Sequence, residues 1–242
     1  MTTLGRDIDA LLNRNSAGNI SFIGFFSTHN AIEVKPVNSS VFASGVSDEL
    51  WWYSAADNIA DFKQFLKDLK GRVAYLAVLT DEQLALVKEH YSIEWTLSCM
   101  RYILPNNVSI SNLQEDINPS KLKVTDANKV FTNSNYSAYT NPVYIAGQIA
   151  NGPSAGVRLD GSLVGWALTH DDTALGMLHV LDDYRRKGIA RALVVSLIQQ
   201  VRQSNRIPFT YVEHSNEASN GLVRSLGFVP DRNVHWVKVN LK

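Results

Sequence analysis

The segment Arg185-Arg186-Lys187-Gly188-Ile189-Ala190 places three adjacent cations beside two small residues, directly before the most regular helical pattern of the chain. Glycine and alanine let a backbone approach a ligand closely, and the free N–H groups of a helix's first turn then point at that ligand. The positive end of the helix dipole and the three side-chain charges both favour an anion at this position. The segment therefore indicates a cradle for a phosphate or pyrophosphate group.

The pattern alone is weak evidence, because average residue usage gives roughly one chance match to [Arg/Gln]-x-x-Gly-x-[Gly/Ala] per four chains of this length. It is neither a P-loop nor a dinucleotide fingerprint, since neither GxxxxGK[ST] nor GxGxxG occurs. Its context strengthens the interpretation. An apolar run over 174–181 precedes it, and Ile189, Leu193 and Leu197 begin an apolar stripe at helical spacing after it.

The elements around this segment predict an α/β protein in two halves, residues 1–120 and 121–242, joined by a polar, proline-containing linker at 105–121. In the first half we expect strands at 20–26, 32–37, 50–53, 73–79 and 93–104, and helices at 55–70 and 80–91. In the second half we expect strands at 122–124, 155–159, 162–169, 174–181, 210–213 and 236–241. Helices are expected from about 125, from Asn141-Pro142 to near 152, from 189, and from Ser215 or Asn216 to Gly227.

Composition narrows the function classes. The chain of 242 residues carries 23 basic and 23 acidic side chains, which argues against general binding of nucleic acids or membrane surfaces. Residues 174–242 hold a local excess of +5, which is either random scatter or a face toward an anionic ligand. The single cysteine, Cys99, excludes an intrachain disulfide and is expected to be a packed thiol. Histidine spacing indicates no metal site, and the short apolar runs predict a soluble, most simply cytoplasmic, protein.

The run GMLHVLDDYRRKGIARALVVSLI, followed by VEHSNEASNGLVRSLGF, resembles the acyl-CoA-binding core of the GNAT superfamily of N-acyltransferases. The SNEAS…LGF segment and the N-terminal extension most resemble the glycine N-acyltransferase-like branch. The resemblance implies the GNAT fold for 121–242: a mixed, mostly antiparallel central sheet in which the fourth and fifth strands splay apart. It leaves open whether the smaller α/β half at 1–120 is a degenerate copy of that fold.

The resemblance also implies a site for acetyl-CoA or another acyl-CoA, which is a co-substrate. Backbone amides of 186–190 would hold the pyrophosphate, and the splayed strand would pair with the pantetheine arm and polarise the thioester carbonyl. The next helix start would contact the pantetheine or thiol end, although Asn216 could be a pure helix cap and Ser219 a solvated or packed residue. The implied residues are Leu178, His179, Val180, Arg185, Arg186, Lys187, Gly188, Ile189, Ala190, Asn216 and Ser219.

Catalytic residues do not carry over from the resemblance. Positions at which relatives place a base align with Ala174 and Gly176, and the position of a tyrosine acid aligns with Val223. We therefore predict Glu213 or His214 as the base, acting directly or through one water. His179, Asp171 and Asp172 are further candidates, each with a packing or turn-forming alternative.

The predicted function is direct transfer of an acyl group, most simply acetyl, from acyl-CoA to a primary amine such as glycine or another small amino acid. The alternative is an acyl-CoA-binding module without catalysis. Oligomeric state is not predicted.

Overall fold

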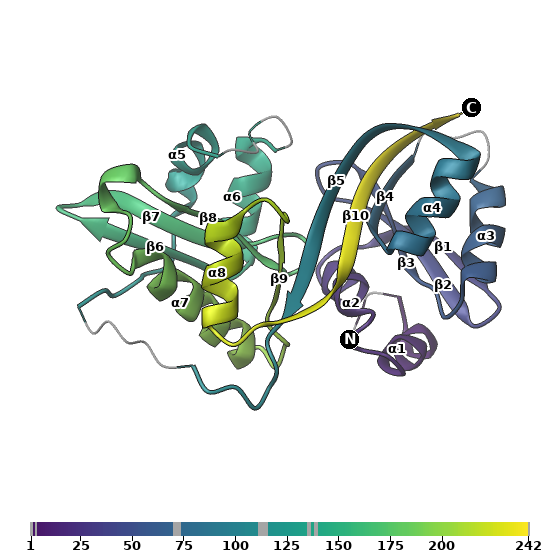
Figure 1. Cartoon of the computed structure of the whole chain (residues 1–242), viewed down its shortest axis with the longest axis horizontal. Coiled ribbons are helices and arrows are strands. Elements are labelled where there is room, and N and C mark those ends of the chain that lie inside the picture. The colour runs from purple at the N-terminus through teal and green to yellow at the C-terminus, as the bar shows by residue number, and fades with distance from the viewer. Residues whose placement is uncertain are drawn as a thin grey trace. The chain divides into compact units, whose positions relative to one another are not determined.

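The computed structural model describes residues 2, 4–69, 74–110, 116–134, 137 and 140–241. The chain divides into two compact units (Figure 1). Unit 1 consists of Met1–Arg101, Glu213–Ser215 and Asp231–Lys242, and unit 2 consists of Tyr102–Val212 and Asn216–Pro230. This division differs from the expected single boundary at 120/121. Unit 1 ends at Arg101 in the first half of the chain and also contains the C-terminal strand.

Unit 1 is a sheet with helices on both faces. Its elements are α1 (Arg6–Asn13), α2 (Ile20–Phe26), β1 (Ala31–Val37), β2 (Ser40–Val46), β3 (Leu50–Ala55), α3 (Ile59–Asp68), β4 (Ala74–Leu79), α4 (Asp81–His90), β5 (Tyr91–Ile103) and β10 (Val229–Leu241). The strand order is β1-β2-β3-β4-β10-β5. β1 and β2, β2 and β3, and β4 and β10 pair antiparallel, whereas β3 and β4 pair parallel.

Successive residues of β3 enter opposite cores, as the period-2 geometry of a strand requires. Trp52 packs in a cluster with residues of α3 and α4, whereas Trp51 and Tyr53 pack in a cluster with residues of α1 and α2. All three aromatic side chains are buried. This aromatic run therefore stabilises both faces of the sheet of unit 1.

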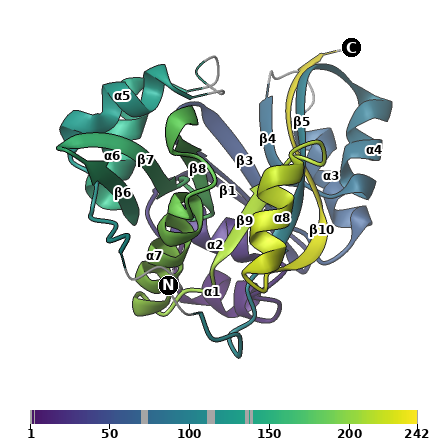
Figure 2. The same ribbon diagram turned by 60° about the vertical axis from the view of Figure 1, so that its left-hand side comes forward.

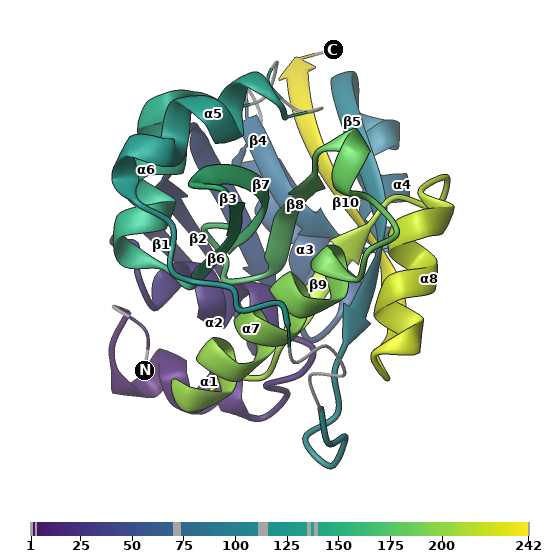
Figure 3. The same cartoon turned by 90° about the vertical axis from the view of Figure 1, so that its left-hand side faces the viewer.

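Unit 2 contains the anion-cradle segment. Its elements are η1 (Val124–Asp126), α5 (Ala127–Thr132), α6 (Pro142–Asn151), β6 (Ser154–Leu159), β7 (Ser162–Thr169), β8 (Leu175–Val180), η3 (Asp182–Tyr184), α7 (Ile189–Gln203), β9 (Phe209–Val212) and α8 (Glu217–Ser225). The strand order is β9-β8-β7-β6, with β8 and β9 parallel and the other pairs antiparallel. Figure 3 shows α5 and α6 on one side of this sheet and α7 on the other.

The chain runs twice through one order of elements. Each time two helices precede three antiparallel strands, and then a helix, a parallel strand, a helix and a long strand follow. The two long strands are β5 and β10, and β10 belongs to unit 1 although it follows the elements of unit 2. The helices α3 and α7 occupy the same place in this order. The expected fold class, a mixed and mostly antiparallel sheet with helices, is confirmed, and the first half of the chain has the same order of elements as the second.

Two predicted strands are wrong. Residues 20–26 form the helix α2, in which six of seven residues are buried, because a short apolar run suits a buried helix as well as a buried strand. Residues 122–124 lead into the 3-10 turn η1, where the Asp126 carboxylate accepts a hydrogen bond from Lys123 N at 2.8 Å and pairs with Arg158. A side chain that accepts a hydrogen bond from a nearby backbone N–H favours a turn over pairing with a neighbouring strand.

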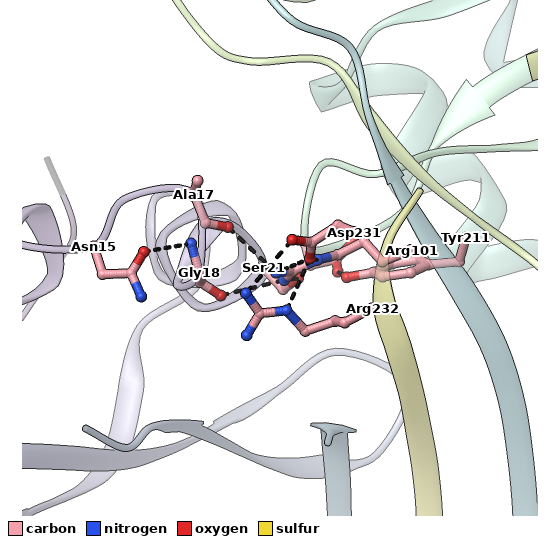
Figure 4. A network of polar contacts seen from close by, with 9 residues as sticks. Asn15, Ala17, Gly18, Ser21, Arg101, Tyr211, Asp231 and Arg232 are labelled. Atoms are coloured by element: carbon pink, nitrogen blue, oxygen red, sulfur yellow. Dashed lines mark hydrogen bonds and ion pairs between the residues drawn. The ribbon is translucent and has the colours of Figure 1, made fainter. Parts of the chain in front are cut away.

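An ion pair in unit 1 joins a buried cation to a partly exposed carboxylate (Figure 4). The side chain of Arg101 is 1% exposed, and its Nε and Nη2 contact Asp231 Oδ2 at 2.8 and 2.6 Å. Its other N–H groups donate to the carbonyls of Ala17 and Gly18, at 3.3 and 3.2 Å, and to Ser21 Oγ at 3.4 Å. The turn between α1 and α2 is thereby held to β5 and β10.

Candidate functional site

The strand β8 carries a bulge at its centre. Its register with β7 steps from His179 to Gly176, so that Ala167 alone lies opposite Met177 and Leu178. Met177 has φ 46°, a left-handed conformation that is rare for a residue with a side chain. A two-against-one count is the definition of a β-bulge, and the extra residue's backbone groups are left outside the ladder. Those groups could pair with an extended ligand.

The strands β8 and β9 pair only near the start of β8 in the part of the chain that the structure describes. Leu175 is registered with Thr210, whose Oγ1 donates to Leu175 O at 2.6 Å. The following residues of β8, 176–179, are half-buried. This arrangement agrees with the expected splay of these two strands.

A turn with two left-handed residues connects β8 to α7 (Figure 2). Arg186 has φ 59°, and Gly188, the N-cap residue, has φ 81°. Gly188 supplies no side-chain cap, and the first helical bond runs from Ala192 N to Gly188 O at 3.1 Å. The amides of Ile189 and Ala190 therefore have no acceptor within the helix and point out of its positive end.

Cations and acids alternate in this turn. Arg185 donates from Nε to Val180 O at 3.0 Å and pairs with Asp182 at 2.7 Å. Lys187 Nζ donates to Asp183 O at 3.0 Å, and Arg186 is exposed. The three cations outnumber the two acids over 182–187. The turn thus presents a net positive charge beside uncapped amides.

The helix α3 of unit 1 is the equivalent of α7, and side chains of unit 1 occupy its N-terminus. Asn58 caps α3 by accepting from Asp61 N at 2.9 Å. The buried carboxylate of Asp61 accepts from Asn38 and Ser40, each at 2.7 Å, and from Asn58 at 3.1 Å. The hydrogen bond from Asn38, followed by that from Ser40, holds the pKa of Asp61 below its ordinary value. A second anion is therefore disfavoured at α3, whereas α7 remains suited to one.

The remaining predicted acyl-CoA residues also lie in unit 2. His179 stacks on Trp166 with 4.7 Å between ring centroids, and burial, followed by the charge of Arg185, lowers its pKa. Asn216 caps α8 by accepting from Ser219 N at 3.0 Å, so the helix-cap interpretation of Asn216 holds. The Val180 carbonyl already accepts from Arg185.

The two predicted catalytic residues fall in unit 1 rather than with the cradle in unit 2. The negative charge of Glu213 adds to burial in raising the pKa of Cys99 to about 12, and the charge of His214 contributes to lowering the pKa of Asp81. Their surroundings in unit 1 are thus Cys99 and the N-terminus of α4.

Sequence reasoning missed His170. A Cβ atom at position 176 would lie 2.0 Å from His170 Nε2, so the imidazole occupies the space that the absent side chain of Gly176 leaves. His170 is placed there by a tight turn in which its N–H donates to Ala174 O at 2.8 Å. The neighbouring Asp172 is buried and accepts from Ala174 N and Tyr211 Oη, which supports its turn-forming role.

Within the described residues, His, Cys, Asp and Glu side chains form no group of three or more that could hold a metal ion. The helices in that same portion are too short or too polar to cross a bilayer.

One family model matches part of this chain, and several proteins of known structure are similar to it. The family model of FR47-like proteins matches residues 155–237, which run from β6 into β10. No curated protein matches the chain. A Drosophila protein of known structure is 18% identical, with 97% of this chain and 87% of that chain covered and a TM-score of 0.71.

Two further structures carry descriptive names. An acetyltransferase of the GNAT family from Colwellia psychrerythraea is 13% identical, with 96% and 97% of the chains covered and a TM-score of 0.55. A tandem GNAT protein from the clavulanic acid biosynthesis pathway is 13% identical, with 91% and 87% covered and a TM-score of 0.51. These likenesses show that the chain has the fold of these GNAT structures, and the FR47-like family model matches within the same chain, over residues 155–237.

Proposed function

We propose that the protein is an N-acyltransferase that moves an acyl group, most simply acetyl, from acyl-CoA to a primary amine. The observation that carries the proposal is the uncapped N-terminus of α7, with Gly188 at φ 81° and three cations beside it. Such an arrangement is suited to binding a pyrophosphate, and the N-terminus of α3, which the chain's own side chains fill, favours unit 2 over unit 1 as the site.

The bulged strand β8 would hold the pantetheine arm. Its backbone at Met177 and Leu178 lies outside the β7 ladder, so N–H and C=O groups there can pair with the amides of an extended ligand. A backbone N–H directed at the thioester carbonyl would stabilise the negative charge that develops when the amine attacks. The acyl group supplies the electrophilic carbon, and coenzyme A leaves as the thiol.

The attacking ammonium must first lose a proton. Glu213 and His214 remain proposed bases, acting through water, and His170 joins them because its imidazole occupies the side-chain space at position 176. The base is identified by measuring kcat/KM for three variants, His170→Ala, Glu213→Gln and His214→Ala. A loss of about 10²–10⁴-fold in one variant, with acyl-CoA binding intact, identifies the base. Losses under about tenfold in all three indicate that solvent takes the proton, in which case kcat/KM rises with pH toward the amine pKa.

The amine acceptor and the length of the acyl chain can be identified by screening acyl-CoA donors against amines for release of coenzyme A. The resemblance of the SNEAS…LGF segment makes glycine and other small amino acids the first acceptors to test. Release of coenzyme A with an amine supports the enzyme. Acyl-CoA binding without release under any amine supports the alternative, a silent acyl-CoA-binding module, which the absence of an acidic or basic side chain on Ala174 and Gly176 themselves favours.

The cradle is tested by Gly188→Glu and isothermal calorimetry with acetyl-CoA. The variant places a side chain and a negative charge in the phosphate site, and we expect binding to be nearly abolished. Gly161→Glu is the matched control, because Gly161 also has positive φ, 76°, but has open space around it in the β6–β7 turn. Unchanged affinity in Gly188→Glu would refute the cradle.

A further inference from the structure

A serine, a histidine and an aspartate form a hydrogen-bonded series inside unit 1. Ser98 on β5 has its Oγ 2.8 Å from His235 Nδ1, and His235 on β10 has its Nε2 3.0 Å from Asp81 Oδ1. The strands β5 and β10 are neighbours in the sheet, and Asp81 is the first residue of α4. His235, which lies 137 and 154 positions from its two partners, therefore joins a hydroxyl to a carboxylate through its imidazole ring.

Hydrogen-bond chemistry gives this series a direction. The Asp81 carboxylate can only accept, so the proton of a neutral His235 ring lies on Nε2 and leaves the lone pair of Nδ1 facing Ser98. The hydroxyl of Ser98 then donates to that lone pair. Hydrogen bonds from His235 and then from Asn233, whose Nδ2 lies 3.1 Å from Oδ2, hold the pKa of Asp81 below its ordinary value and keep it ionised.

Burial separates the roles of the three groups. The His235 side chain is 8% exposed, so water competes little for its nitrogens. Ser98 is half-buried, whereas the Asp81 side chain is 68% exposed. The positive end of α4 stabilises the negative charge of Asp81 at the first helical position. His214 adds a nearby positive charge when it is protonated.

We propose that Ser98 is a nucleophilic serine that takes acyl groups from small activated esters, with His235 as its general base. Asp81 is a positioning residue that holds the tautomer of His235 and stabilises the imidazolium. A nucleophile bonded to a base that a third group orients is the arrangement by which serine hydrolases activate a hydroxyl. The two ring nitrogens are used here in the opposite order, with Nδ1 toward the serine.

The step balances without a further reagent. Ser98 Oγ forms a bond to the ester carbonyl carbon while its proton moves to His235 Nδ1. The bond between that carbon and the leaving alkoxide or aryloxide oxygen breaks, and the leaving group takes the proton from His235. Water then attacks the acyl-serine with His235 again accepting a proton, so that ester and water give acid and alcohol.

The test uses the full chain with p-nitrophenyl acetate, followed by peptide mass spectrometry. We expect one acetyl group per chain, on Ser98, and its loss in Ser98→Ala. Ser92→Ala is the matched control, because Ser92 is an exposed serine on the same strand, and it should leave acetylation unchanged. His235→Gln should slow acetylation by about 10²–10⁴-fold, and Asp81→Asn by a smaller factor.

Three results would overturn the proposal: absence of acetylation in the wild type, equal acetylation of Ser98→Ala, or an unchanged rate in His235→Gln. A fluorophosphonate probe, which forms a stable ester with activated serines, gives a second readout of the same hydroxyl. Thermal melting of each variant shows that it is folded. If His235→Gln does not fold, Ser98→Ala, which removes one half-buried oxygen, decides the outcome together with the mapped acetylation position.

Discussion

Asp231→Ala removes the carboxylate that faces the buried guanidinium of Arg101. The Arg101 side chain is 1% exposed, and both of its contacts with Asp231 are short, at 2.6 and 2.8 Å. The alanine variant leaves a buried charge compensated only by two carbonyls and one hydroxyl. Removing one partner of a fully buried pair costs about 3–5 kcal/mol, and we expect the lower end of that range because the Asp231 side chain is 22% exposed. In a protein of this size 1 kcal/mol lowers Tm by about 2–4 °C, so a drop of about 6–12 °C is expected.

The assay is thermal unfolding followed by tryptophan fluorescence, because four of the five tryptophans belong to unit 1. Glu94→Ala is the matched control: Glu94 pairs with Lys238 between the same two strands, but the two side chains are 45% and 27% exposed. Exposed pairs contribute about 0–1 kcal/mol. If Asp231→Ala and Glu94→Ala lower Tm equally, the reasoning from burial is refuted.

The same pair gives a pH dependence. Burial raises the pKa of Asp231, but the hydrogen bond from Arg232 and the charge of Arg101 outweigh it and hold that pKa below its ordinary value. The folded state therefore binds a proton on Asp231 less readily than the unfolded state does. The contribution is present above the unfolded pKa of about 3.9 and is lost as pH falls through the folded value. Urea unfolding of wild type and Asp231→Asn should converge in that acidic range.

Two further predictions concern single residues. Burial, with the charge of Glu213, raises the pKa of Cys99 to about 12, so its thiolate fraction at pH 8 is on the order of 10⁻⁴ against about a quarter for an ordinary thiol. Iodoacetamide should therefore label Cys99 rapidly only after denaturation, as followed by intact mass, and fast labelling of the native chain would contradict this. Asn216→Ala removes the cap of α8 and should cost about 1 kcal/mol. A Tm equal to that of the wild type would mean that the cap contributes nothing.

Local chemistry made part of this fold predictable. Asp160 and Gly161 take positive φ between β6 and β7, which is the conformation that an Asp-Gly hairpin turn requires. Thr80 forms a capping box with Gln83 at the start of α4. The glycine turn before α7 was also predictable from local pattern, because Gly188 takes φ 81° directly before a regular apolar helical stripe; its role as an anion cradle stays a prediction.

Contacts between distant segments were not predictable from one sequence. The helix α2 was mistaken for a strand because its burial comes from packing against other elements of unit 1. His170 reaches the space beside Gly176 through the conformation of a four-residue turn. Ser98 and His235 are 137 positions apart and meet only because β5 and β10 are neighbours.

The place of β10 has a consequence for synthesis on the ribosome. Its residues follow all of unit 2 in the chain, yet they pair with β4 and carry Asp231 to Arg101. Most of unit 1 emerges from the ribosome before unit 2 but lacks an inner strand and the partner of its buried cation until β10 is translated. The order of completion is therefore reversed: unit 2 can close while unit 1 waits with an open sheet edge, which is the state that chaperones protect.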